Sequence, residues 1–477
     1  MTEKRLASYY RKDRDMIKKV FQIGEFVLSL FMFIILHVGL FLYEKSTWMW
    51  VIGIFVVFVC LYQVVKKVQI STRIYAIMIV AYTLCIVGAE LYIMDTQMPT
   101  LIADFEDVKT QTEWYAYSGG IKEDLHEYFS IFPHNINIFI LFSMIYKLSG
   151  SYMGVVIFVI LCSNISSILT ALSIKHLTHN SHASLFVFVL MEILMVLTTR
   201  TYWPYTSNPG ILFIILTFYL YVCPLPKIWK CGLIPLVASG ALMIKLTAII
   251  PFIAIIMVEG IQLMKNYHKD NMKYIAMSVL FTCLFFGVTK AYETYSWNKA
   301  GYTYDEGKYR GFWYFTCLGQ YTESSGQWHS YVFNELGNYK GNKEERDNFY
   351  KQYTIKQILD RGIFGNIKFY IAKSTAGWGS TNLDLVEING KGVLCHFVRH
   401  SIWYSLMMLM SLAIFLNRRK DKYIHVAYLT ISGVLLYLLI SEIQFAYVWM
   451  YCPILFVLSG VSLDGMSKLV FSNKHIP

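Results

Sequence analysis

The chain alternates long apolar segments with short polar ones, and many of the apolar segments are long enough to cross a membrane. A helix needs roughly 20 apolar residues to span the hydrocarbon core of a bilayer. The candidate spans are 22–43, 47–65, 74–94, 153–175, 182–200, 209–223, 274–291, 400–416, 423–441 and 445–463. The run 231–264 is too long for one helix and carries Lys245 near its middle, so we divide it into two spans. The pattern predicts an all-α polytopic membrane protein with about twelve membrane-spanning helices.

A further apolar segment, 135–150, is short, and whether it crosses decides the orientation of every later span. Cytoplasmic loops of membrane proteins retain Lys and Arg. If 135–150 does not cross, the inner side receives the N-terminal tail and the basic residues Lys66, Lys67, Arg73, Lys175, Lys227, Lys230, Lys265, Lys269, Lys273, the loop NRRKDK at 417–422, Lys468 and Lys474. We therefore predict that 135–150 is a helix lying at the outer surface, and that both termini are cytoplasmic.

This orientation divides the chain into regions on the two sides of the cell membrane. The predicted regions are a cytoplasmic tail (1–21), three spans (22–94), a first outer loop (95–152), six spans (153–291), a large outer loop (292–399), three spans (400–463) and a cytoplasmic tail (464–477). In the large outer loop, residues 344–378 follow a helical period that breaks at Gly362 and Gly365. We expect an amphipathic helix close to the membrane there, and side-chain chemistry on the extracytoplasmic face.

Composition supports a membrane protein and removes several functional classes. Hydrophobic residues make up 56% of the chain and charged residues only 15%, whereas a soluble protein carries about a quarter charged residues. The net charge of +11 lies in short clusters between apolar runs, so no nucleic-acid partner is expected. There is no CxxC pair and no Walker, GxGxxG, HExxH or Ser-His-Asp pattern, so neither a divalent metal nor another cofactor is indicated.

The segment IADFEDV places Asp104, Glu106 and Asp107 just beyond the third predicted span. Carboxylates at a membrane boundary are costly to bury and are often functional. Asp104, with Asp107 as the second candidate, could act as general base towards an acceptor hydroxyl that attacks a sugar anomeric carbon. A solvated acidic loop is the alternative, because this loop is acidic throughout.

The next segment, YFSIFPHN, feeds an aromatic turn into the predicted surface helix. Tyr128 and its aromatic neighbours could stack on a sugar or pack on acyl chains, while His134 and Asn135 could donate hydrogen bonds to a phosphate. An aromatic belt at the membrane interface explains the same residues.

Isolated charges lie at the outer ends of three predicted spans. Lys245 and Arg200 could each neutralise a lipid phosphate or snorkel to the interface. Glu442 follows the eleventh span, where a solvated helix cap is the ordinary explanation.

The large outer loop contains two aromatic segments, FWYFTCLGQYTESSGQWHSY and FYIAKSTAGWGS. Trp328 and Trp378 are of the type that stacks on sugars, and Lys373 lies in the second segment. Interfacial aromatics are common in any membrane protein, so both interpretations remain open.

Taken in order, these features resemble a known group of enzymes. The order is Ala103-Asp104 after an early span, YFSIFPHN, a helix ending in KLSG, the Lys of GALMIK, the long loop with CLGQYTESSGQW, and Glu442, Tyr447 and Pro453 near the end. Over roughly residues 74–463 the chain is similar to GT-C-type membrane glycosyltransferases that use polyprenyl-phosphate sugars, in particular to bacterial relatives of the protein O-mannosyltransferases.

The resemblance implies transfer of a sugar, with inversion, from a polyprenyl-phosphate carrier to a cell-wall glycopolymer, lipid-linked glycan or protein on the outer face. Asp104 falls where the family carries its catalytic Asp, and Lys245 where a family lysine lies close to the carrier phosphate. The predicted donor-phosphate residues are Lys245, Arg200 and His134. The predicted substrate-binding residues are Tyr128, Asn135, Trp328, Lys373, Trp378 and Glu442.

Two departures from the family pattern bear on this assignment. Where many relatives carry an acid after a Tyr-Thr pair, this chain has Asn208 in the sequence Tyr-Thr-Ser-Asn, which argues against a two-acid metal site. Where many relatives have Arg-Tyr near the C-terminus, this chain has Ala446-Tyr447. Either another cation substitutes for that arginine, or the substrate or activity differs.

Two other functional classes fit a polytopic protein of this kind. A transporter or flippase for a lipid-linked saccharide usually has shorter outer loops and internally repeated helices. A polysaccharide polymerase or ligase would share the large outer loop, but we expect such a loop to depend on arginines, which are scattered here. Outer stretches of about 58 and 108 residues without a visible repeat favour the transferase.

Overall fold

The structure, a computed structural model, describes residues 23–24, 26–32, 34, 48–97, 104–265, 269–302, 310–337, 342–378, 392–416 and 421–472. Within these residues the chain forms helices and no strands, which confirms the all-α prediction for this part of the protein. The predicted tail 1–21 and most of the first predicted span lie outside the described residues.

Most predicted spans coincide with a helix of the structure. These helices are α2 (Trp48–Val65), α3 (Thr72–Gln97), α7 (Tyr152–Thr178), α8 (Ser181–Val196), α9 (Ser207–Val222), α10 (Lys227–Ile244), α11 (Ile250–Lys265), α12 (Lys269–Lys299), α15 (Gly392–Leu416), α16 (Lys422–Ile440) and α18 (Cys452–Ser472). In the described part of the chain, six helical segments are long and apolar enough to cross a membrane: α3, α7, α10, α11 with the turn before it, α12 and α16. These six support a multi-span membrane protein, but the predicted count of about twelve is not confirmed.

The apolar run 231–264 is divided at Lys245, as the sequence predicts. Helix α10 ends at Ile244, Lys245 itself is extended (φ −158°, ψ 127°), and the 3₁₀ turn η3 (Leu246–Ile249) leads into α11. Because the chain turns here, Lys245 lies at the ends of two helices instead of in the middle of one long span.

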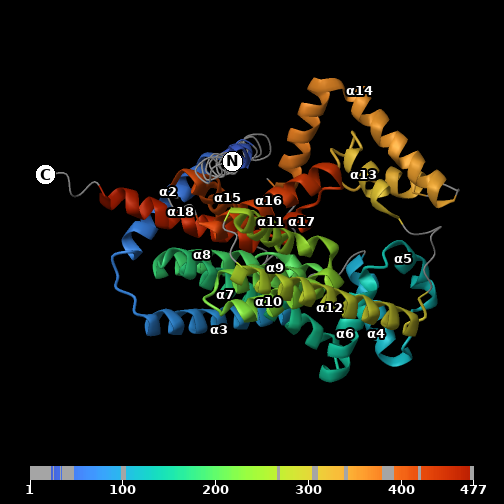
Figure 1. Cartoon of the computed structure of the whole chain (residues 1–477), viewed down its shortest axis with the longest axis horizontal. Helices are drawn as coiled ribbons and strands as arrows, with labels where there is room; N and C mark the ends of the chain where they lie inside the picture. The colour runs from blue at the N-terminus through green and yellow to red at the C-terminus, as the bar shows by residue number, and fades with distance from the viewer. Residues whose placement is uncertain are drawn as a thin grey trace.

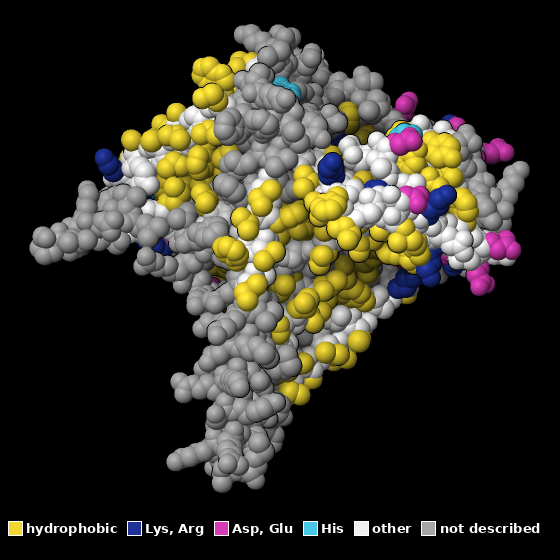
Figure 2. Space-filling view, turned by 90° about the horizontal axis from the view of Figure 1, so that it is seen from above, with side chains coloured by type: hydrophobic (Ala, Val, Ile, Leu, Met, Phe, Trp, Pro, Cys, Tyr) yellow, Lys and Arg dark blue, Asp and Glu magenta, His cyan; other side chains and the backbone are white. Residues whose placement is uncertain are grey.

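The long helices run side by side as a bundle, and the polar outer segments lie together at one end of it (Figure 1). Buried residues of α9, α15 and α18, among them Ile214, Met407 and Leu455, belong to one large apolar core. On the face seen in Figure 2, hydrophobic side chains occupy much of the described surface in the middle of the molecule, and acidic and basic side chains gather at the end that carries α13 and α14. This distribution is typical of a membrane protein with a polar end outside the bilayer.

Two groups of helices build that polar end. The first predicted outer loop contains α4 (Asp104–Ser118), η1 (Glu123–Leu125), α5 (His126–Ile131) and α6 (Asn135–Ser149). The large outer loop contains α13 (Phe312–Gln320), the π-helical turn η4 (Val332–Leu336) and α14 (Lys343–Trp378). Helix α14 bends at Gly362, whose φ of 59° is readily adopted only by glycine, and this confirms the predicted break. Helix α6 is the predicted surface helix, and it packs against α4 and α7.

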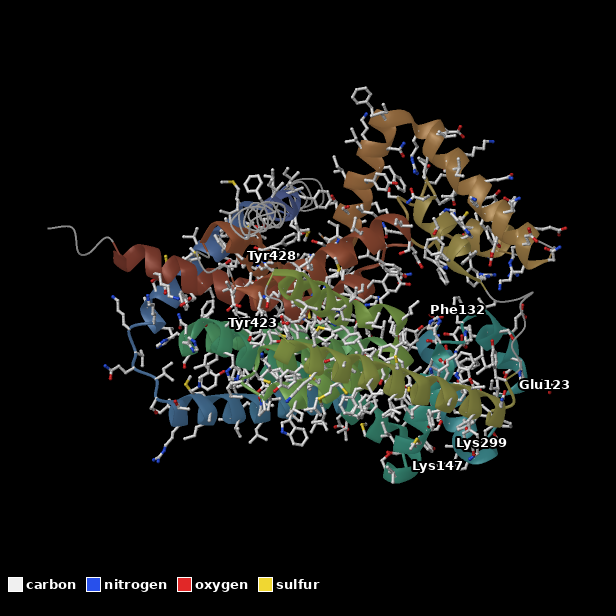
Figure 3. All side chains as sticks on the ribbon, viewed as in Figure 1. Glu123, Phe132, Lys147, Lys299, Tyr423 and Tyr428 are labelled. Carbon is white, nitrogen blue, oxygen red and sulfur yellow. The ribbon has the colours of Figure 1, made fainter. Side chains whose placement is uncertain are left out.

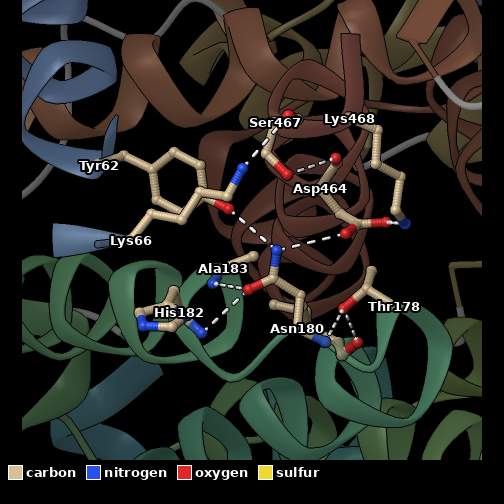
Figure 4. A network of polar contacts seen from close by, with 10 residues as sticks. Tyr62, Lys66, Thr178, Asn180, His182, Ala183, Asp464, Ser467 and Lys468 are labelled. Carbon is tan, nitrogen blue, oxygen red and sulfur yellow. Dashed lines mark hydrogen bonds and ion pairs between the residues drawn. The ribbon is translucent and has the colours of Figure 1, made fainter. Parts of the chain in front are cut away.

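A network of polar contacts joins helices at the end of the bundle opposite to α4 (Figure 4). Asn180 caps α8 by accepting hydrogen bonds from the backbone N–H groups of His182 and Ala183 at 3.0 and 3.1 Å. Its amide nitrogen donates to the Tyr62 hydroxyl at 3.1 Å and to Asp464 Oδ1 at 3.2 Å. These polar groups already have partners within the protein, so they stabilise this end of the bundle.

Candidate functional site

Asp104 is the first residue of α4 and lies at the polar end of the bundle. With Glu106 and Asp107 it places three carboxylates in the first helical turn, where the helix dipole favours negative charge. The helix dipole accounts for acidic residues at these three positions, but Asp104 also makes a tertiary contact. Its Oδ2 accepts a hydrogen bond from the Tyr205 hydroxyl at 3.1 Å, across 101 residues of sequence. A tertiary contact therefore fixes the position of this carboxylate.

The Tyr205 hydroxyl is oriented in turn by Asn135, the first residue of α6. The fully buried Asn135 side chain donates through Nδ2 to the Tyr205 hydroxyl at 3.1 Å and to the Tyr128 hydroxyl at 2.7 Å. Because the Tyr205 oxygen accepts from Asn135, its own proton is directed towards Asp104. The structure thus brings together Asp104, Tyr128 and Asn135, which the sequence predicts, and adds Tyr205, which the sequence prediction missed.

Asp104 has the properties of a proton acceptor that a ligand can reach. Burial raises the pKa of Asp104 above the ordinary value, while the hydrogen bond from Tyr205 and the positive charge of Lys245 act in the opposite direction. The side chain nevertheless keeps partial contact with solvent. Asp107 lies on the same helical turn, where burial and the charge of Asp104 raise its pKa as well. The pair therefore offers one carboxylate held by a tertiary contact and a second beside it.

Lys245 reaches the same region from the break between α10 and α11. Its Nζ lies 4.7 Å from the centroid of the Tyr447 ring, a cation–π contact. It is also within electrostatic range of Asp104 and of Glu442. Within the described part of the chain, no hydrogen bond or ion pair occupies this ammonium group. The group therefore has donors left for a ligand.

Glu442 lies between the end of α16 and the short helix α17 (Phe445–Trp449), and it is only 4% exposed. Its carboxylate accepts hydrogen bonds from the Tyr447 hydroxyl at 3.3 Å and from the Gln444 side chain. Burial, reinforced by the negative charge of Asp104, raises the pKa of Glu442 to about 7, although these hydrogen bonds and Lys245 oppose the shift. Glu442 is therefore part of the charged group around Lys245, and it is too buried to be a solvated helix cap.

The other two predicted phosphate-binding residues also lie near Lys245. Arg200 is in the 3₁₀ turn η2 (Thr199–Thr201), where its guanidinium lies 5.9 Å from the centroid of the Phe105 ring and its charge acts on Lys245. His134 directly precedes Asn135, remains exposed, and is within electrostatic range of Lys245. Arg200 and His134 therefore both lie within electrostatic range of Lys245, which is itself within range of Asp104.

Aromatic side chains lie next to these charged residues and connect them to the large outer loop. Phe105, the neighbour of Asp104, packs on Tyr205 with ring centroids 5.0 Å apart. Phe132 stacks on Phe333 of the large outer loop at 6.4 Å, and the Trp328 ring lies 6.0 Å from Phe333. Figure 3 shows Phe132 at the junction between α5 and the large outer loop. The Phe132 ring in turn lies 5.3 Å from the Tyr128 ring, so three aromatic contacts connect Trp328 to Tyr128. Trp328 remains 52% exposed.

Two predicted substrate-binding residues of α14 have other contacts. Lys373 is fully buried, and its Nζ donates to the backbone carbonyls of Gly319 at 2.5 Å, Ser441 at 2.7 Å and Leu439 at 3.1 Å. Trp378 is fully buried in the main apolar core, where its carbonyl accepts a hydrogen bond from the indole of Trp403 at 3.1 Å. These contacts hold α14 against the bundle; Lys373 is within electrostatic range of Glu442, but its hydrogen bonds to the described residues all go to backbone carbonyls.

The arrangement as a whole can bind an anion beside a proton acceptor. The cations would hold a phosphate, the aromatic rings could pack on a sugar, and Asp104 could remove a proton from a hydroxyl group placed between them. The described residues contain no group of three or more His, Cys, Asp or Glu side chains placed to hold a metal ion.

Comparison with known proteins gives a family but no characterised relative. No curated protein and no solved structure matches the chain. A family model described as "Conserved hypothetical integral membrane protein" matches residues 9–380, which is well over half of the chain. The protein therefore belongs to this family of conserved hypothetical integral membrane proteins.

Proposed function

We propose that the protein is a membrane glycosyltransferase that moves a sugar from a polyprenyl-phosphate carrier to an acceptor at the extracytoplasmic face. The observation that carries the proposal is the placement of Asp104 within electrostatic range of Lys245, an ammonium group with no hydrogen-bond partner among the described residues. The sequence resemblance to GT-C-type enzymes points to the same pair. The acceptor would be a cell-wall glycopolymer, a lipid-linked glycan or a protein.

In this proposal the membrane and the charged site bind different parts of the donor. The apolar tail of the carrier stays in the bilayer, while its phosphate is held by Lys245, with Arg200 and His134 as further donors. As the acceptor oxygen attacks the anomeric carbon, Asp104 takes the proton of the acceptor hydroxyl. The bond between the anomeric carbon and the phosphate oxygen breaks, and its electron pair leaves with the phosphate. Attack from the face opposite to the leaving group inverts the anomeric configuration.

Arg200 supports one of the two explanations for the missing Arg-Tyr pair. Ala446 stands where many GT-C relatives carry the arginine, and a methyl group cannot pair with phosphate. Arg200 supplies a guanidinium from a different segment, and its charge already acts on Lys245. We propose that it takes over the phosphate contact of the missing residue.

The proposal is tested with the full-length protein in lipid nanodiscs and a panel of undecaprenyl-phosphate hexoses. Membranes from a deletion strain serve as the acceptor source, and release of undecaprenyl phosphate is followed by mass spectrometry. Asp104→Asn should lower the rate on the order of a hundredfold or more, because general base catalysis contributes about 10²–10⁴. Glu106→Gln, which changes an exposed carboxylate on the same helical turn, should keep the rate.

Two outcomes would contradict this function. If no donor of the panel loses its sugar in the wild type, the protein does not use this class of donor. If the donor crosses a vesicle membrane intact and depends on Asp104, the protein is a transporter or flippase for the lipid-linked saccharide.

A further inference from the structure

A second set of acidic side chains lies inside the helix bundle, apart from Asp104. Glu90 on α3 and Glu192 on α8 are both fully buried, and Asn164 on α7 is 1% exposed. Asn164 Nδ2 donates a hydrogen bond to Glu90 Oε2 at 2.7 Å, and Glu90 is within electrostatic range of Glu192. The three side chains come from three helices that pack on one another.

Apolar clusters close this polar layer at both ends. The first cluster comprises Tyr75, Ile79, Ala171, Leu185 and Phe188. The second cluster comprises Ile93, Met94, Val156, Ile160, Val196 and Tyr202. Along each of the three helices, the polar residue lies between the residues of the first cluster and those of the second. Glu90, Asn164 and Glu192 therefore share one level of the bundle, with apolar packing on either side along the helices.

Four oxygen atoms of this layer have no hydrogen-bond partner among the described residues. They are Glu90 Oε1, Asn164 Oδ1 and both carboxylate oxygens of Glu192. Buried acceptors without donors cost free energy, and a buried unpaired carboxylate costs more.

Neither helix–helix hydrogen bonding nor protonation of one glutamate provides donors for all four oxygen atoms. Hydrogen bonding between membrane helices accounts for the bond from Asn164 to Glu90. The Ser167 hydroxyl on α7 lies close to Glu192, but its hydrogen bond goes to the Ser163 carbonyl at 3.4 Å, and it is at most one donor for the two oxygens of Glu192. Protonation of one glutamate would supply a single donor for four acceptors. Ionisable residues inside a membrane protein commonly mark an ion or proton pathway.

We propose that Glu90, Asn164 and Glu192 form a binding site for a small hard cation within the helix bundle. Such cations take oxygen ligands, and this layer offers two carboxylates and an amide oxygen from three helices. A bound cation would neutralise the carboxylates and satisfy the oxygens that the protein leaves without donors. Because each ligand comes from a different helix, the cation would also hold α3, α7 and α8 together.

The test measures thermal unfolding of the purified full-length protein while choline chloride is replaced by NaCl, KCl, MgCl₂ or CaCl₂ at constant ionic strength. A ligand that binds only the folded state raises the unfolding temperature with its concentration. We expect one of these cations to raise it saturably by a few degrees in the wild type. Glu123→Gln, which changes an exposed carboxylate, should keep the shift, and Glu192→Gln and Glu90→Gln should lose it.

A direct measurement keeps the test decisive if a variant fails to fold. Scintillation proximity with the radioactive form of the stabilising cation should show saturable binding to the wild type, displaced by the unlabelled cation. If none of the four cations shifts the unfolding temperature or binds, the carboxyl groups are held protonated and the proposal is wrong. A shift of equal size in both folded glutamate variants would also overturn it, because the cation would then bind elsewhere. Neither readout depends on sugar transfer.

Discussion

Lys245 and Lys373 both lie within electrostatic range of Glu442, but their ammonium groups differ in their hydrogen-bond partners and in their burial. Lys373 is fully buried and donates to three backbone carbonyls. Lys245 keeps partial solvent contact and lies over the Tyr447 ring. A lysine whose N–H groups all donate to backbone carbonyls holds the fold together, whereas a lysine whose N–H groups lack protein partners can bind a ligand.

The contact between the large outer loop and the residues that follow α16 shows what Lys373 stabilises. Besides the three bonds of Lys373, the backbone N–H of Glu442 donates to the Phe315 carbonyl at 3.1 Å, and that of Ile443 donates to the Gly326 carbonyl at 2.9 Å. A Cβ at Gly319 would overlap the backbone of Ser441, so only glycine allows this close approach. Lys373 thus connects the large outer loop to the segment that carries Glu442, which in turn lies near Lys245.

The largest expected effect comes from Lys373→Met, which removes the donor of three carbonyls. The Leu439 carbonyl also accepts from Gln320 Nε2 at 2.8 Å, so two carbonyls, those of Gly319 and Ser441, lose their partner. Each buried acceptor left without a partner costs about 1–3 kcal/mol, so the free energy of unfolding should fall by about 2–6 kcal/mol. Thermal unfolding in detergent measures this loss. Lys356→Met changes an exposed lysine of the same helix and should have little effect. Equal unfolding temperatures for the two variants would mean that Lys373 does not hold the outer loop.

Tyr205→Phe should have a smaller effect, on the reaction and not on the fold. The variant removes the hydroxyl that donates to Asp104 at 3.1 Å, a bond that holds the carboxylate in place and favours its ionised form. Sugar transfer should slow about tenfold, and the acidic limb of the rate profile should move to higher pH, because ionisation of Asp104 becomes harder. Tyr117→Phe, at a residue that is 80% exposed, is the control. An unchanged pH profile would show that Asp104 does not act as the base.

A further expected effect concerns Glu442 and the pH dependence of the free energy of unfolding. The pKa of Glu442 is raised from 4.5 to about 7 in the folded protein, so the folded state binds a proton more tightly than the unfolded state. The stability that this proton contributes is fully present below pH 4.5 and is lost as the pH rises through 7.

Glu442→Gln should abolish this pH dependence. Relative to the variant, the wild type should lose about 2 kcal/mol of unfolding free energy between pH 5 and pH 7. Unfolding temperatures measured across this range test it. Parallel curves for the two proteins would mean that Glu442 stays ionised in the folded state.

Features set by neighbouring residues could be predicted from the sequence. The division of the apolar run at Lys245 and the break of α14 at Gly362 are both present in the structure. A charge in a long apolar run and a glycine in a helical period are local signals, so no tertiary information was needed.

Contacts between distant segments could not be predicted in the same way. Tyr205 is 101 residues from Asp104, and in its segment the sequence points to Arg200 as a cation and to Asn208 in place of an acid, not to Tyr205 itself. Lys373 and Trp378 looked like substrate-binding types because their side chains suit that role. Only the packing of α14 shows that the Lys373 donors are used by carbonyls and that Trp378 lies in the main core. Residue type limits what a side chain can do, and its partners decide what it does.

In the proposed function, Lys245, whose ammonium group has no hydrogen-bond partner among the described residues, receives the phosphate of a lipid carrier. The most direct test is the affinity of the full-length protein in nanodiscs for undecaprenyl phosphate, measured by microscale thermophoresis. Because a hydrogen bond to a charged group contributes about 1.5–3 kcal/mol, Lys245→Ala should weaken binding roughly tenfold to a hundredfold and leave the unfolding temperature nearly unchanged. Equal affinities in the wild type and Lys245→Ala would show that Lys245 does not bind the carrier phosphate.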